Sequence, residues 1–146
     1  MSTLELENVA AAVCYIAHLG QIDKSGVPYY LHPYRVANYL DEKDHEGRTV
    51  AYLHDVLEDT KLTVSDLVSL MFPPEIIASV VTLTRVNNEP SDAYYARVRQ
   101  NAVAKRVKKA DIKDNTDPKR LALLPKETSD RLIKKYSHAI YELDKE

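Results

Sequence analysis

The sequence predicts an all-α fold, a single compact array of about seven or eight helices. Only three of the 146 residues are glycine, and the apolar residues recur at helical rather than alternating spacing. Hydrophobic residues make up 45% of the chain and charged residues 29%, which is typical of globular proteins and excludes disordered and collagen-like chains. This length is that of one ordinary domain, so we expect residues 1–146 to form a single domain.

The first helices are predicted from the spacing of apolar residues and the positions of prolines. Apolar residues three and four positions apart mark two helices, at Val9, Val13, Ile16 and Ala17 and then at Val36, Ala37 and Leu40. A helix over residues 66–71 should stop before Pro73, because proline disfavours helical geometry in the residue before it. The next helix, over residues 74–83, has proline in its tolerated first turn.

The second half of the chain is predicted to alternate between loops and helices. Residues 86–92 form a loop by their Asn, Pro and Ser content, and residues 117–125 form a connection bounded by two prolines. Between them, residues 93–115 make one or two helices, with Asn101 as a candidate cap. The last helix runs from about Lys126 to the C-terminus.

Composition also narrows the classes of function. No apolar run approaches the roughly 20 residues of a membrane span, and the N-terminus carries glutamates where a signal peptide would be basic, so we expect a cytoplasmic protein with no membrane partner. The net charge of −2 gives no global attraction to nucleic acid. The basic run at residues 105–109 fits a solvated helix face. The single Cys14 is expected to pack in the core.

Ionisable residues concentrate in AYLHDVLEDT, residues 51–60, which otherwise has the pattern of a buried helix. In a helix, His54 and Glu58 are four positions apart and Asp55 and Glu58 are three apart, so they share one side. Charged groups that face an apolar core need partners, because burying an unpaired charge is costly. A bound metal ion would be such a partner.

A metal site needs more ligands, because a His-Asp dipeptide often arises by chance. His32 is one candidate, at the end of the glycine-containing loop formed by residues 20–33. Pro33 is suited to begin the next helix, which would put His32 at the helix cap with its imidazole free to turn inward.

Asp111 is the other candidate ligand. Asn115 follows it by four positions and Lys108 precedes it by three, so one helix face presents a ligand, an amide and a cation together. Each of these residues could equally have a structural role.

Taken together, these segments resemble one family. The matching pieces are AHLGQ (17–21), SGVPYYLHP (25–33), AYLHDVLEDT (51–60), LTR (83–85) and VKKADIKDN (107–115). In this order they are similar to the HD-domain metal-dependent phosphohydrolases, specifically the hydrolase domain of the RelA/SpoT enzymes and the small alarmone hydrolases. The resemblance covers most of the chain. It implies an HD-domain helical array that removes the 3′-diphosphate from (p)ppGpp by means of a metal-activated water.

The resemblance implies that His32, His54, Asp55 and Asp111 hold the metal, with manganese as the first choice. Two imidazoles and two carboxylates also suit iron or zinc, so the ligand chemistry does not choose among these ions. The metal would leave positions for water and a substrate phosphate oxygen, and it would lower the pKa of that water.

Further residues match family positions that act on the substrate. Glu58 and Asp59 match an acidic pair that orients or deprotonates the attacking water, although a solvated helix end is an alternative that fits Asp59 better than Glu58. Asn115 matches a position that contacts the nucleotide. Lys108 would neutralise phosphate charge or hold Asp111, and His18 would support the site from behind the ligands.

Two positions depart from the family pattern, namely Asp23 and Lys109, which stands where an apolar residue is expected. Asp23 stands where the family commonly has an arginine that stacks on guanine, and a carboxylate cannot make that contact. Lys24 follows it and could take a related role in substrate binding, although its ammonium lacks the planar shape of a guanidinium.

Alternative functions follow from the departure at Asp23. The chain could hydrolyse another nucleotide or a dinucleotide phosphate, or it could be a non-catalytic module that senses a nucleotide. In each case we expect a small-molecule nucleotide partner and no nucleic acid, and the sequence leaves self-association open. His45 and His138 have no ligand-like neighbours in the sequence and are expected to have no role.

Overall fold

The protein folds into ten α-helices in the computed structural model, which describes residues 1–146. The helices are α1 (Thr3–Ala17), α2 (Leu31–Tyr39), α3 (His45–Leu53), α4 (Val56–Asp59), α5 (Val64–Ser69), α6 (Pro74–Leu83), α7 (Ser91–Arg99), α8 (Ala102–Asn115), α9 (Pro118–Leu121) and α10 (Lys126–Leu143). Only α4 and α9 are single turns, of four residues each. The remaining eight helices confirm the predicted all-α class and helix number. No helix has both the length and the hydropathy that a membrane span requires.

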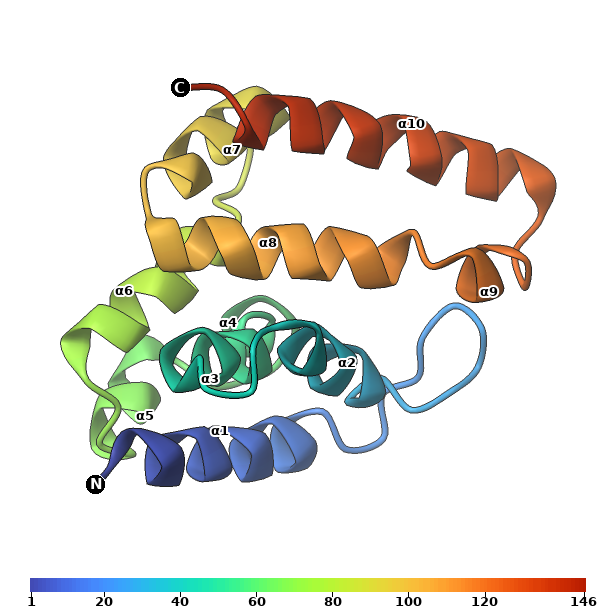
Figure 1. The fold of residues 1–146 in the computed structure, drawn as a ribbon. Helices are drawn as coiled ribbons and strands as arrows, with labels where there is room; N and C mark the ends of the chain where they lie inside the picture. Colours follow the sequence, from blue (N-terminus) through green and yellow to red (C-terminus); the bar gives the residue numbers. More distant parts are fainter.

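The helices are stacked so that α2, α3 and α4 lie between two outer parts of the fold (Figure 1). α1 packs on one side of α3, and α8 packs on α2 and α3 from the other side. Beyond α8 lies α10, which runs in the opposite direction and also packs on α7. α2, α3 and α8 therefore pack on one another inside the molecule, where side chains between them can be shielded from solvent.

The hydrophobic core is centred on α3. Val50, Ala51 and Leu53 of this helix have no exposed surface, and neither do Cys14 of α1 or Val107 of α8. Burial confirms the predicted core position of Cys14. Because α3 is enclosed on several sides, the residues that follow it directly begin in a buried environment.

Helix ends follow local rules that the sequence already indicates. The side chain of Asn101 accepts a hydrogen bond from the backbone amide of Ala104 over 3.0 Å, so it caps α8 and separates it from α7 as predicted. Pro74 begins α6, also as predicted. Thr63 caps α5 through a reciprocal pair of hydrogen bonds with Asp66.

Several predicted boundaries are wrong. Residues 51–60 do not form one helix, because α3 ends at Leu53 and α4 begins only at Val56. α2 begins at Leu31, ahead of Pro33, so His32 lies within the first turn rather than at the cap. Tertiary packing of the residues around the candidate site overrides the local signals here. The helix predicted over 66–71 runs from Val64 to Ser69, and the connection 117–125 contains α9.

Candidate metal centre and active site

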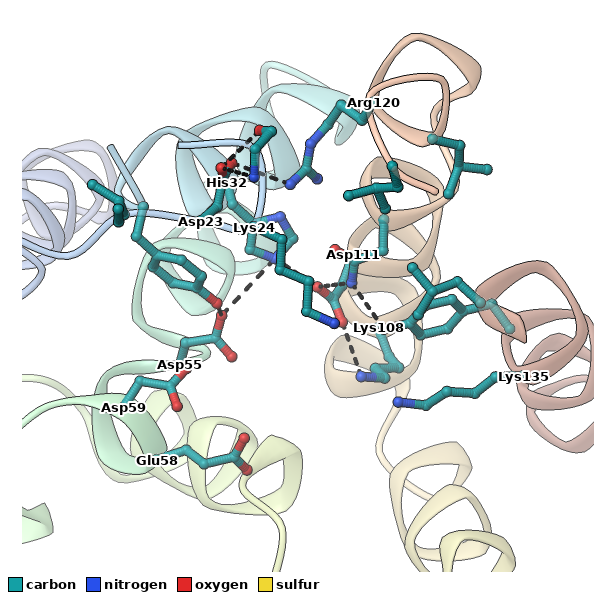
Figure 2. A pocket seen from close by; sticks show the side chains of 18 of the residues that line it. Asp23, Lys24, His32, Asp55, Glu58, Asp59, Lys108, Asp111, Arg120 and Lys135 are labelled. Carbon is teal, nitrogen blue, oxygen red and sulfur yellow. Dashed lines mark hydrogen bonds and ion pairs between the residues drawn. The ribbon is translucent and has the colours of Figure 1, made fainter. Parts of the chain in front are cut away.

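The four predicted ligands converge from three parts of the fold. His32 comes from α2, His54 and Asp55 from the break between α3 and α4, and Asp111 from α8. Nε2 of His32 lies 2.8 Å from Oδ1 of Asp111. Nε2 of His54 lies 3.1 Å from Oδ2 of Asp55 and 3.4 Å from Oδ1 of Asp111. Two imidazoles and two carboxylates thus face a common centre, and Figure 2 shows His32, Asp55 and Asp111 around it.

The break after α3 sets the direction of the His54 ring. Nδ1 of His54 lies 2.6 Å from the carbonyl oxygen of Ala51, so Nδ1 donates its hydrogen there. Nε2 is buried without a hydrogen bond of good geometry, although carboxylate oxygens of Asp55 and Asp111 are near it. A buried nitrogen lone pair that faces carboxylates is stable with a cation between them. This donor set therefore fits a divalent metal ion.

The electrostatics of the centre also favour positive charge. Burial by itself would lower the pKa of His54, but the nearby carboxylates of Asp55 and Asp111 outweigh it and raise that pKa well above its usual value. Burial would raise the pKa of Asp111, but Lys108 and the two histidines hold it well below the usual value. The carboxylates stay ionised, and a metal that binds here displaces protons from the imidazoles.

The acidic pair lies beside the ligands on α4. Carboxylate oxygens of Asp55, Glu58 and Asp59 lie within 4.8 Å of one another. Glu58 accepts a hydrogen bond from the backbone amide of Arg85 over 2.9 Å. Burial and the charges of Asp55 and Glu58 raise the pKa of Asp59 to about 6. Asp55 and Glu58 lie close together as predicted, in spite of the helix break. The ring of His54 lies near His32 and Asp55.

These groups open onto a cavity of about 390 Å³, a size common for small-molecule sites. Figure 2 shows the acidic groups Asp55, Glu58 and Asp59 on one side of it and the amines of Lys108 and Lys135 on the other. Opposite charges on facing walls can bind an anionic ligand on one side while a cation and a water molecule are held on the other.

The predicted substrate-binding residues also line this cavity. Lys108 is 13% exposed and pairs with Asp111 over 2.9 Å, so its ammonium is already engaged by a ligand carboxylate. Asn115 donates to Oδ1 of Asp111 over 3.2 Å. Lys24 is exposed at the rim.

Asp23 has structural partners that the sequence did not suggest. Its carboxylate accepts hydrogen bonds from the backbone amides of Ser25 and Val27 and pairs with Arg120 over 3.4 Å. Asp23 therefore closes the turn of its own loop, and the guanidinium beside it comes from α9 (Figure 2).

The residues that line the cavity and that the sequence reasoning missed include Tyr29, Arg85, Arg120 and Lys135. The hydroxyl of Tyr29 donates to Oδ2 of Asp55 over 2.6 Å, and both Tyr29 and Arg85 lie inside motifs that were recognised. Arg120 and Lys135 lie outside the recognised motifs, so the sequence around them does not indicate a place in the site. Only the packing of α9 and α10 beyond α8 brings them to the site.

His18 does not contact the ligand set directly. Its Nδ1 lies 2.8 Å from Oε1 of Gln21, and its ring centroid is 5.1 Å from that of Tyr29. Burial lowers the pKa of the His18 imidazole and favours its neutral form. His18 is linked to the site through Tyr29 and through Gln21, which donates to the carbonyl oxygen of Asp59, so its supporting role stays a prediction.

The fold gives each of the other two histidines an acidic partner from a distant part of the sequence. Nδ1 of His45 lies 3.0 Å from Oε1 of Glu7. Nε2 of His138 lies 2.7 Å from Oδ1 of Asp92, a residue of α7 that only the tertiary fold brings near. Both contacts join separate helices, which is sufficient to explain them.

Comparison with known proteins gives consistent matches over part of much longer chains. No family model matches the sequence. A guanosine-3′,5′-bis(diphosphate) 3′-pyrophosphohydrolase of Borreliella burgdorferi is 30% identical over 131 residues, which are 80% of this chain and 19% of that protein. The bifunctional (p)ppGpp synthase/hydrolase SpoT of Escherichia coli is 48% identical over 56 residues, 37% of this chain and 8% of that protein. The chain thus spans about a fifth or less of the length of these relatives.

A solved structure shares the whole arrangement of helices. The metazoan ortholog of SpoT that hydrolyses ppGpp superposes with a TM-score of 0.80 at 22% sequence identity, covering 95% of this chain and 85% of that one. This likeness establishes the fold. The chain is therefore similar in sequence to proteins named as (p)ppGpp 3′-pyrophosphohydrolases, and similar in fold to a structure named as a ppGpp-hydrolysing SpoT ortholog.

Proposed function

We propose that the protein is a metal-dependent phosphohydrolase that removes the 3′-diphosphate from guanosine 3′,5′-bis(diphosphate). The observation that carries this proposal is the buried set of His32, His54, Asp55 and Asp111 at the base of a cavity with acidic and basic sides. The similarity to proteins named for this activity supports the choice of substrate. We also infer that residues 1–146 act as one domain.

His32, His54, Asp55 and Asp111 would hold the ion, which we propose is manganese, with iron or zinc as alternatives that the same donors suit. When bound, a divalent cation polarises a phosphate oxygen and makes a water molecule more acidic. Tyr29 would keep the Asp55 carboxylate oriented through their 2.6 Å hydrogen bond.

The remaining residues would bind the substrate and move a proton. Glu58 and Asp59 would orient the attacking water and accept its proton. The pKa of Asp59, raised to about 6 by burial and its acidic neighbours, suits that task near neutral pH. Water would add to the phosphorus attached to the ribose 3′ oxygen. The bond between this phosphorus and the ribose 3′ oxygen would break. The 3′ oxygen would gain a proton, and pyrophosphate would be released.

The negative charge of the substrate would be neutralised on the basic side of the cavity. We propose that Lys24 and Lys108 bind phosphate oxygens and that Asn115 contacts the nucleoside. Lys108 is within 2.9 Å of Asp111, so it could bridge that ligand and a phosphate.

A second candidate keeps the mechanism and changes the nucleotide. It is favoured by Asp23, whose carboxylate is committed to its own turn and to Arg120 rather than to a base. A panel of guanosine and adenosine 3′,5′-bis(diphosphates), simple nucleotides and dinucleotide phosphates, each with Mn²⁺-loaded protein, separates the candidates. Preferred release of pyrophosphate from the guanosine compound supports the first proposal. Turnover of another member supports the second, and binding without turnover would indicate a sensor.

A further inference from the structure

A fully buried carboxylate lies directly behind one of the candidate ligands. Asp114 of α8 is 0% exposed. Its Oδ2 lies 2.6 Å from Nδ1 of His32 and 2.7 Å from Nη1 of Arg120, and its Oδ1 lies 2.7 Å from Nε of Arg35. Side chains from α2 and α9 thus meet on one acid of α8.

The contact with His32 determines which nitrogen can face the metal centre. An imidazole that donates its Nδ1 hydrogen leaves the lone pair of Nε2 free as a ligand. Nε2 of His32 is the atom that lies 2.8 Å from the ligand Asp111. Asp114 and the metal centre therefore contact opposite nitrogens of one ring, the arrangement in which a carboxylate fixes the tautomer and direction of a metal-binding histidine.

Two guanidinium groups hold Asp114 in place and balance its charge. Arg35 lies on the same helix as His32, one turn further along, and Arg120 reaches in from α9. Arg120 also pairs with Asp23 over 3.4 Å, so the loop that carries Lys24 is tied to the same carboxylate. A buried acid with two cationic partners is costly to assemble, and its role should therefore extend beyond neutralising arginines.

We propose that Asp114 is a positioning residue for the metal: it fixes the Nδ1–H tautomer and the ring orientation of His32, and Arg35 and Arg120 hold Asp114 in place. This inference rests on the metal site of the proposed function. It assigns a role to a residue that touches neither the ion nor the substrate.

Metal affinity tests the proposal without reference to activity. The free Mn²⁺ signal in electron paramagnetic resonance gives the dissociation constant for the wild-type protein, for Asp114→Asn and for Asp144→Asn. Asp144 makes an exposed ion pair with Lys109 and serves as the matched control. We expect Asp114→Asn to weaken Mn²⁺ binding by about 10- to 100-fold, the usual effect of removing such a support, and Asp144→Asn to leave it unchanged.

A second variant and a spectroscopic measurement on the wild-type protein test the proposal even if Asp114→Asn misfolds. Asp114→Asn leaves two partly buried guanidinium groups without their acid, so Asp114→Asn/Arg120→Gln is measured as well. Its Mn²⁺ binding should stay weak, and recovery to the wild-type value would overturn the proposal. In the Zn²⁺-loaded wild-type protein, nitrogen-15 NMR should show His32 protonated at Nδ1. Protonation at Nε2 would also overturn it.

The outcomes separate this inference from the proposed function. If the wild-type protein binds no Mn²⁺, the metal site itself is wrong. If the wild-type protein binds Mn²⁺ and Asp114→Asn binds it equally well, the metal site stands and the role of Asp114 is refuted.

Discussion

Replacing Lys108 by methionine tests whether the centre is built to hold positive charge. The ammonium lies 2.9 Å from Oδ2 of Asp111, and the two side chains are only 13% and 7% exposed. At an effective dielectric constant of about 20, attraction over this distance is about 6 kcal/mol. His32 and His54 share the charge of Asp111, so we expect a loss near the lower end of the range for breaking a buried pair, about 3 kcal/mol.

The assay is thermal unfolding, followed by circular dichroism, with and without metal. In EDTA, a loss of about 3 kcal/mol corresponds to a fall in Tm of roughly 6–12 °C for a chain of this size. Saturating Mn²⁺ should reduce the difference between the Lys108→Met variant and the wild-type protein, because the ion restores the positive charge that Asp111 has lost. Metal binding to the folded state also stabilises both proteins by mass action.

The adjacent residue provides the matched control. Lys109 pairs with Asp144 over 2.7 Å, but these side chains are 42% and 49% exposed. Lys109→Met should therefore lower the free energy of unfolding by less than about 1 kcal/mol, and this loss should be the same with and without Mn²⁺. Equal losses in the two variants, or a loss in Lys108→Met that Mn²⁺ leaves undiminished, would refute the reasoning.

Three further outcomes are expected. Burial raises the pKa of the Cys14 thiol to about 12, so a thiol reagent at pH 8 should leave the native protein unmodified, and labelling within minutes would contradict its burial. Met71 is 73% exposed with a φ of 73°; Met71→Gly should raise the free energy of unfolding by about 0.5–1 kcal/mol in urea, whereas a decrease would show that its backbone is unstrained. Glu58→Gln should lower kcat by about 100-fold or more with Mn²⁺ binding retained, and an unchanged kcat would remove Glu58 from catalysis.

Helix ends that are set by a single proline or a capping side chain could be predicted from the sequence. Pro74 begins α6 because its fixed φ and missing amide are compatible with the first helical turn. Asn101 separates α7 from α8 because its side chain satisfies a free backbone amide. The four candidate ligands could also be named from the sequence, because histidines and carboxylates in apolar surroundings require partners and their motifs appear in a recognised order.

Long-range contacts explain what the sequence did not show. The apolar pattern of residues 51–60 continues across His54 and Asp55 and gives no sign that the helix stops between them. His45 and Glu7 meet because α1 packs on α3. Arg120 reaches Asp114 and Asp23 only because the chain turns sharply after α8. Such contacts join positions up to 97 residues apart, beyond the reach of any helical period.

The most direct test of the proposed function is the release of pyrophosphate from guanosine 3′,5′-bis(diphosphate), measured for Mn²⁺-loaded protein, for protein stripped by chelation and for Asp55→Ala. Asp55 lies 3.1 Å from His54 in the ligand set, and its loss should remove a metal ligand. The account predicts pyrophosphate from the loaded wild-type protein and background levels from the other two. Full activity in the stripped protein or in Asp55→Ala would contradict it.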